Sequence, residues 1–95
     1  MPNISILKKT ENDSGWQFIV QITNKDSATE HLVTVPRMTY ERLTGGKVEP
    51  DELIIKSFEF LLEREPKESI LGEFEIDVIG NYFPEWSQAM VKQLS

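Results

Sequence analysis

The alternation of apolar and polar side chains over residues 16–24 restricts the fold more than any other feature of the chain. Four large apolar residues occupy every second position, namely Trp16, Phe18, Val20 and Ile22. Successive side chains of a β-strand point to opposite faces, so this spacing places all four on one face and polar residues on the other. The segment is therefore predicted to be a strand with one buried face.

Two further segments of strand character flank this one. Residues 3–9 show apolar alternation, and residues 29–35 are rich in β-branched side chains. Turn-forming residues at 11–15 and 24–27 separate the three segments. Because short loops join neighbouring antiparallel strands, the three segments are expected to form an antiparallel meander.

Two helices are expected after the meander. The first is short and runs from Thr39, a candidate N-cap, to Leu43, where two glycines end it. The second is the main helix of the chain and covers residues 50–65. Pro50 suits its first position, and Pro66 closes it because proline cannot continue a helix.

The main helix carries two apolar faces. A stripe about 120° wide at 100° per residue should face the sheet, and it consists of Ile54, Ile55, Phe58, Leu61 and Leu62. Leu53 and Phe60 lie on a different side and form a second seam that the sheet cannot cover. The cover is expected from the aromatic C-terminal segment, and the alternative is a second copy of the helix in a homodimer. The candidate interaction surface is therefore Leu53, Phe60, Tyr82 and Trp86.

Residues 67–83 are open to two interpretations. Phe74, Ile76 and Val78 alternate with acidic residues as in a strand, whereas the spacing from Ile76 to Phe83 is helical. We favour a short helix from Val78, preceded by a turn or a helical stub over residues 69–74. A last helix is expected with Pro84 as its first residue, and it carries Trp86, Met90 and Leu94.

These elements define the expected fold class. The chain has 95 residues, which is the size of one compact domain. We expect a single α+β domain over residues 1–95, in which a three-stranded antiparallel meander is followed by the main helix and two or three short helices.

Charge is distributed unevenly and argues against nucleic acid as a partner. Residues 1–47 carry six basic and five acidic side chains, whereas residues 48–95 carry four basic and eleven acidic ones. A polyanion would be repelled by the second half of the chain. A basic patch could form only if strand and loop ends converge in the first half, from Lys8, Lys9, Arg37, Arg42 and Lys47.

Few side chains could carry out chemistry. The absence of cysteine excludes disulfides, thiolate nucleophiles and cysteine-bound zinc. The single histidine, His31, lies in a predicted strand and is interpreted as a structural residue. Glu73, Glu75 and Asp77 lack the glycine turn and the distal glutamate of a calcium loop, so they are interpreted as a solvated face. We expect no catalytic residues, no metal site and no cofactor.

Two resemblances bear on function. From Leu32-Val33-Thr34-Val35-Pro36 through the main helix to Leu62, the order of strand, helix and helix resembles ribbon-helix-helix DNA-binding proteins. That resemblance implies a strand that pairs across a dimer and reads bases. Over residues 39–85 the sequence is also similar to a group of small bacterial proteins with no assigned function, which implies no activity.

The expected function is a non-catalytic protein–protein interaction module of the bacterial cytosol. Its partner is an unknown protein or a second copy of the chain. A nucleic-acid-binding or antitoxin-type regulator of the ribbon-helix-helix kind is the alternative, and a small enzyme is the third hypothesis. No segment reaches the roughly 18 consecutive apolar residues of a membrane span, and no signal peptide is recognised, so we expect neither membrane insertion nor secretion.

Overall fold

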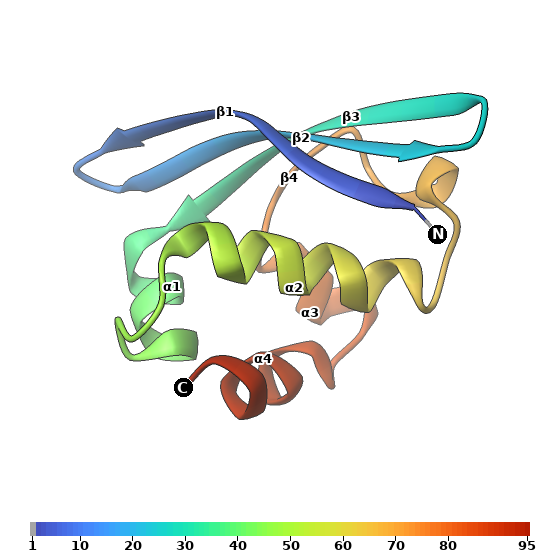
Figure 1. Ribbon diagram of the computed structural model, residues 1–95. Helices are drawn as coiled ribbons and strands as arrows, with labels where there is room; N and C mark the ends of the chain where they lie inside the picture. The colour runs from blue at the N-terminus through green and yellow to red at the C-terminus, as the bar shows by residue number, and fades with distance from the viewer. Residues whose placement is uncertain (1) are drawn as a thin grey trace.

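The computed structural model describes residues 2–95 and contains a four-stranded sheet with helices on one side (Figure 1). The strands lie in the order β1-β2-β3-β4. Three of them form an antiparallel meander, namely β1 (Asn3–Asn12), β2 (Gly15–Asn24) and β3 (Ser27–Pro36). The fourth, β4 (Glu73–Glu75), pairs in parallel with β3. The α+β class and the meander predicted from the sequence are therefore confirmed.

The helices form two layers beneath the sheet (Figure 1). In chain order they are α1 (Arg37–Thr44), α2 (Pro50–Leu62), the short 3-10 helix η1 (Lys67–Ser69), α3 (Val78–Tyr82) and α4 (Trp86–Leu94). Helix α2 runs under the sheet, and α4 lies on the opposite side of α2. The main helix is thus enclosed between the sheet and the C-terminal helix.

The hairpin between β1 and β2 requires a glycine at its end. A β-carbon at Gly15 would lie 2.1 Å from the Val35 carbonyl oxygen, and the residue has a φ of 147°. Only glycine tolerates both conditions. In the register that follows Gly15, Trp16 of β2 lies opposite Val35 of β3, and Phe18 lies opposite Val33. All four side chains are buried.

The turn or helical stub predicted over residues 69–74 is wrong at residues 73 and 74, which belong to β4. The alternative interpretation as a strand is correct for residues 73–75. The 3-10 helix η1 ends at Ser69, and irregular backbone joins it to β4. The strand forms by parallel pairing with Leu32, Val33 and Thr34 of β3, which lie far away in the sequence. The local alternation of side chains cannot reveal a pairing between such distant segments. The helix expected from Val78 is confirmed as α3.

The boundaries of the two central helices also differ from the predictions. Helix α1 begins at Arg37, with Pro36 rather than Thr39 in the N-cap position. The Thr39 hydroxyl instead donates to an Asp77 carboxylate oxygen at 2.7 Å. Helix α2 ends at Leu62, earlier than residue 65. Its start at Pro50 is confirmed, and so is the end of α1 at Gly45, which adopts the left-handed conformation.

Candidate functional site

Three of the four residues of the candidate interaction surface are buried inside the chain. Leu53 is 0% exposed, Phe60 is 5% exposed and Trp86 is 1% exposed, whereas Tyr82 is 67% exposed. A partner cannot reach the first three without unfolding the chain. Of the surface predicted from the sequence, only Tyr82 is accessible from outside the chain.

The second seam of α2, formed by Leu53 and Phe60, is covered by the C-terminal segment, as predicted from the sequence. The indole nitrogen of Trp86 donates to the Ser57 hydroxyl at 3.0 Å, and that hydroxyl donates to the Met90 sulfur at 3.6 Å. The Phe60 and Phe83 rings meet edge to face with centroids 6.0 Å apart. Buried polar atoms need partners, and this seam supplies them within the chain. It needs no second copy of the protein.

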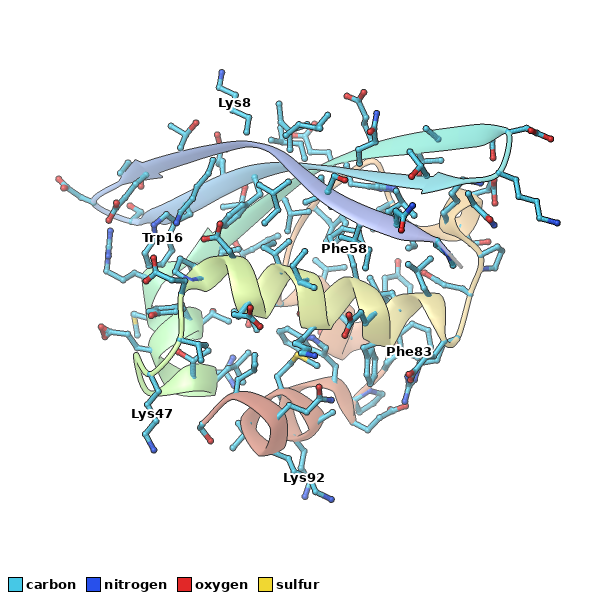
Figure 2. All side chains as sticks on the ribbon, in the orientation of Figure 1. Lys8, Trp16, Lys47, Phe58, Phe83 and Lys92 are labelled. Atoms are coloured by element: carbon cyan, nitrogen blue, oxygen red, sulfur yellow. The ribbon has the colours of Figure 1, made fainter. Side chains whose placement is uncertain are left out.

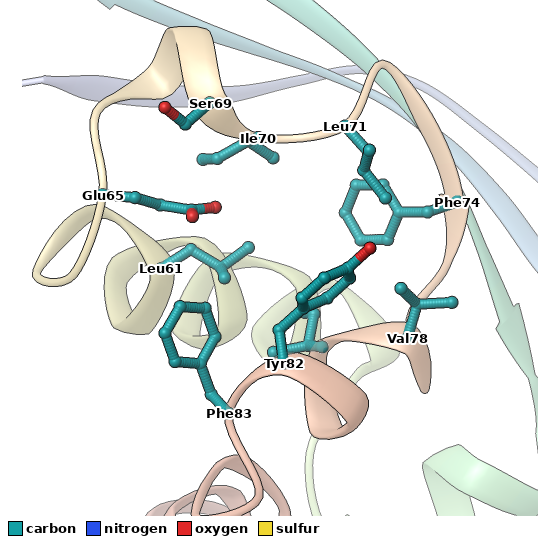
Figure 3. Close-up of a pocket in the computed structure, with 10 residues that line it drawn as sticks. Leu61, Glu65, Ser69, Ile70, Leu71, Phe74, Val78, Tyr82 and Phe83 are labelled. Carbon is teal, nitrogen blue, oxygen red and sulfur yellow. The ribbon is translucent and has the colours of Figure 1, made fainter.

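An open cavity lies where the end of α2 meets α3 and the segment before β4, residues 69–72 (Figure 3). Its volume is about 160 Å³. Apolar side chains form most of its lining, which comprises Leu61, Glu65, Ser69, Ile70, Leu71, Phe74, Val78, Ile79, Tyr82 and Phe83. Leu71 and Tyr82 are 46% and 67% exposed and form its rim. Exposed apolar groups around a concave site are typical of binding surfaces.

His31 supports one wall of this cavity. The Nδ1 atom of its ring lies 2.6 Å from the Leu71 carbonyl oxygen, and the Nε2 atom lies 2.8 Å from the Thr29 hydroxyl. A carbonyl oxygen can only accept, so Nδ1 carries the proton of this bond. The ring is 3% exposed and packs against Phe58 with a centroid separation of 5.6 Å. His31 therefore holds the segment before β4 onto the sheet.

Glu65 brings a charge into the apolar cavity. Its side chain points from the segment after α2 toward the centre of the lining residues (Figure 3). It is half-buried, and within residues 2–95 its carboxylate makes no hydrogen bond or ion pair. Its carboxylate is therefore available for a hydrogen bond or an ion pair with a bound group. The sequence did not single out this residue because it was placed at the end of the predicted helix 50–65, where a charged side chain is usually exposed to solvent.

The five basic residues of the first half do not form a patch. Lys8 rises from the outer face of the sheet, whereas Lys47 lies at the opposite side of the molecule near α1 (Figure 2). The other three are in ion pairs, namely Lys9 with Asp51 at 2.7 Å, Arg37 with Glu11 at 2.9 Å and Arg42 with Asp77 at 3.1 Å. Their charge is largely neutralised by nearby carboxylates, so the basic patch considered from the sequence does not form.

The strand implied by the ribbon-helix-helix resemblance has a different environment. Leu32, Val33 and Thr34 are paired with β2 on one side and with β4 on the other. This part of β3 has no free edge for a strand from a second subunit. The resemblance therefore gains no support from the arrangement of the strands.

Within residues 2–95, no group of three histidine, aspartate or glutamate residues is placed to hold a metal ion. None of the helices in this range has both the length and the apolar character needed to cross a membrane. Comparison of the chain with protein-family models, curated proteins and solved structures gives no significant match in any of the three.

Proposed function

We propose that the protein is a non-catalytic protein–protein interaction module whose docking site is the cavity between α2, α3 and the segment before β4. The observation that supports this most directly is an open apolar cavity with Leu71 and Tyr82 exposed at its rim. The outer face of the sheet also lacks a covering element in Figure 1. However, its strands expose polar residues such as Gln17 and Glu30, so it offers a weaker docking surface.

The size of the cavity favours one side chain of a partner as its occupant. Small-molecule and cofactor sites usually measure about 300–1,000 Å³, whereas this cavity measures about 160 Å³. An apolar cavity of about 150 Å³ accommodates a ring the size of benzene. A single buried anchor side chain with contacts around the rim is typical of protein interfaces, in which a few residues carry most of the binding energy.

The proposal can be tested by photo-crosslinking in cells of the native host. A photoreactive phenylalanine analogue is placed at Tyr82 in one variant and at Met38 in another. Met38 is a suitable control because it is 85% exposed, apolar and located on α1, outside the cavity lining. We expect one defined crosslinked protein from position 82 and none of that mass from position 38.

The same experiment includes a variant that blocks the cavity. Val78→Trp places a large side chain at the cavity lining and should abolish the crosslink from position 82. Circular dichroism first establishes that the variant is folded. Equal crosslinking from positions 82 and 38, or a crosslink unaffected by the blocked cavity, would contradict the proposed docking site.

A further inference from the structure

We infer that the cavity accepts an arginine side chain from a basic segment of the partner protein, with Glu65 as its ionic contact. This inference rests on the proposed function and specifies the chemistry of the partner. It is carried by a combination of groups that recurs elsewhere in the chain. In each of those places an aromatic ring, a carboxylate and a cation lie together, and in the cavity only the cation is missing.

The combination occurs three times among the described residues. The guanidinium of Arg64 lies 3.5 Å from the centroid of the Phe60 ring, and that of Arg37 lies 4.5 Å from the Trp16 ring. The Lys9 ammonium lies 6.0 Å from the Phe18 ring. Each cation also contacts a carboxylate, and these are Glu85 for Arg64, Glu11 for Arg37 and Asp51 for Lys9. Cations are attracted to the faces of aromatic rings, more so when water is excluded.

The cavity contains the same set without its cation. Tyr82 and Phe83 supply aromatic surface, and the Glu65 carboxylate points between the walls (Figure 3). The basic residues nearest in sequence are occupied elsewhere. Arg64 contacts the Phe60 carbonyl oxygen and Glu85, and the Lys67 ammonium donates to Ser27 and to Glu68. A cation that pairs with Glu65 would therefore have to come from another molecule.

An arginine side chain matches both parts of the cavity. A purely apolar side chain would cover Glu65 and leave its carboxylate desolvated without a partner, which is unfavourable. The aliphatic stem of an arginine can pack against Leu61 and Ile79 while its head reaches the carboxylate. Its planar guanidinium is less strongly hydrated than a lysine ammonium and stacks on aromatic rings. The seven-charge excess of acidic residues in positions 48–95 favours a basic segment around it.

The test uses three capped amino acids as probes of the cavity. N-acetylarginine methylamide carries the proposed group, the citrulline derivative has the same shape without the charge, and the leucine derivative is purely apolar. Each is titrated into the full-length 15N-labelled protein, and amide chemical shifts are followed. We expect the arginine probe to shift the amides of Leu71, Tyr82 and Glu65 with a Kd in the millimolar range, and citrulline to bind at least about tenfold more weakly.

Two matched variants assign the effect to one carboxylate. Glu65→Gln should weaken binding of the arginine probe by about tenfold or more, because the charge-assisted hydrogen bond is lost. Glu63→Gln makes the same change in charge in the same turn of chain, but its carboxylate is 76% exposed and outside the cavity lining. It should leave the affinity within about twofold. Unchanged spectra outside the cavity establish that both variants are folded.

The outcomes separate this inference from the proposed function. Binding of the leucine probe but not the arginine probe at the cavity would overturn the arginine assignment and leave a docking site. Equal affinity for arginine and citrulline, or no effect of Glu65→Gln, would also overturn it. No shift at the cavity with any probe would count against both proposals. If the protein self-associates and Glu65→Gln abolishes this self-association, the partner is a second copy of the chain rather than another protein.

Discussion

Two apolar regions beside α2 have similar composition but different degrees of closure. In the seam around Ser57 and Trp86, each buried polar atom has a partner within the chain. In the cavity beside Tyr82, the carboxylate of Glu65 has no partner among residues 2–95, and two apolar side chains are exposed at the rim. The comparison indicates that the seam is closed within the chain, whereas the rim of the cavity, at Leu71 and Tyr82, is open to solvent.

Replacement of Trp86 by alanine should show the largest effect on the closed region. Trp86 is 1% exposed, so the variant Trp86→Ala loses buried apolar surface and leaves a cavity beside Ser57. The expected loss in free energy of unfolding is about 3–5 kcal/mol. Urea denaturation followed by circular dichroism measures it. A loss below about 1 kcal/mol would mean that α4 is not needed to close the seam.

His31→Gln should have an intermediate effect, because His31 joins the closed core to the rim of the cavity. The substitution removes the ring contact with Phe58 and disturbs the bond to the Leu71 carbonyl oxygen. We expect a loss of about 1–3 kcal/mol in stability, measured by urea denaturation. Glu30→Gln, at an exposed neighbouring position, is the control. Equal stability of the two variants would show that His31 is not required to hold this segment.

Lys9→Met tests a place where the chain supplies its own cation. The hydrogen bond to Asp51 raises the pKa of the Lys9 ammonium above its usual value of 10.5. A raised pKa in the folded state stabilises the fold below pH 10.5, and this contribution is lost as the pH rises through the higher folded value. The pair is partly exposed, so we expect a loss of only about 0.2–1 kcal/mol at neutral pH. The difference between wild type and variant should shrink in denaturation curves recorded above pH 10.5.

Tyr82→Ala should have the smallest effect on stability. The side chain is 67% exposed, so its removal should change the free energy of unfolding by no more than about 0.5 kcal/mol. The same variant should weaken binding of the arginine probe, because one aromatic wall is lost. A stability loss comparable to that of Trp86→Ala would show that Tyr82 belongs to the structural core and would remove the contrast between the closed seam and the open rim.

Elements with a strong local pattern could be predicted from the sequence. The alternation from Trp16 to Ile22 places those side chains in the core, where Phe18, Val20 and Ile22 are each 0% exposed. The start of α2 at Pro50 follows from the same kind of local rule, because proline fits the first turn of a helix. The need to cover Leu53 and Phe60 followed from helical periodicity alone, and the structure supplies α4 as the cover.

Features that depend on distant pairings could not be predicted in this way. Residues 73–75 alternate as a strand but are too few to be distinguished from a turn, and their register is set by residues 32–34. The cavity combines side chains from α2, α3 and the segment between them, none of which has a recognisable motif. The charges of Lys9 and Arg37 suggested a patch because their carboxylate partners, Asp51 and Glu11, lie far away in sequence.

The parallel pairing of β4 has a consequence for how the molecule opens. The β1–β2 and β2–β3 hairpins pair strands that are adjacent in the sequence along most of their length. Strand β4, in contrast, is held by only three residue pairs, and its partners lie about 40 positions away in the chain. Segments with few cooperative contacts exchange their amide hydrogens through partial unfolding at a lower free energy than the core. Because Leu71 and Phe74 line the cavity, release of this strand would dismantle the proposed docking site while the meander stays intact. Occupancy of the cavity should accordingly slow hydrogen exchange at residues 71–76 more than in the hairpins.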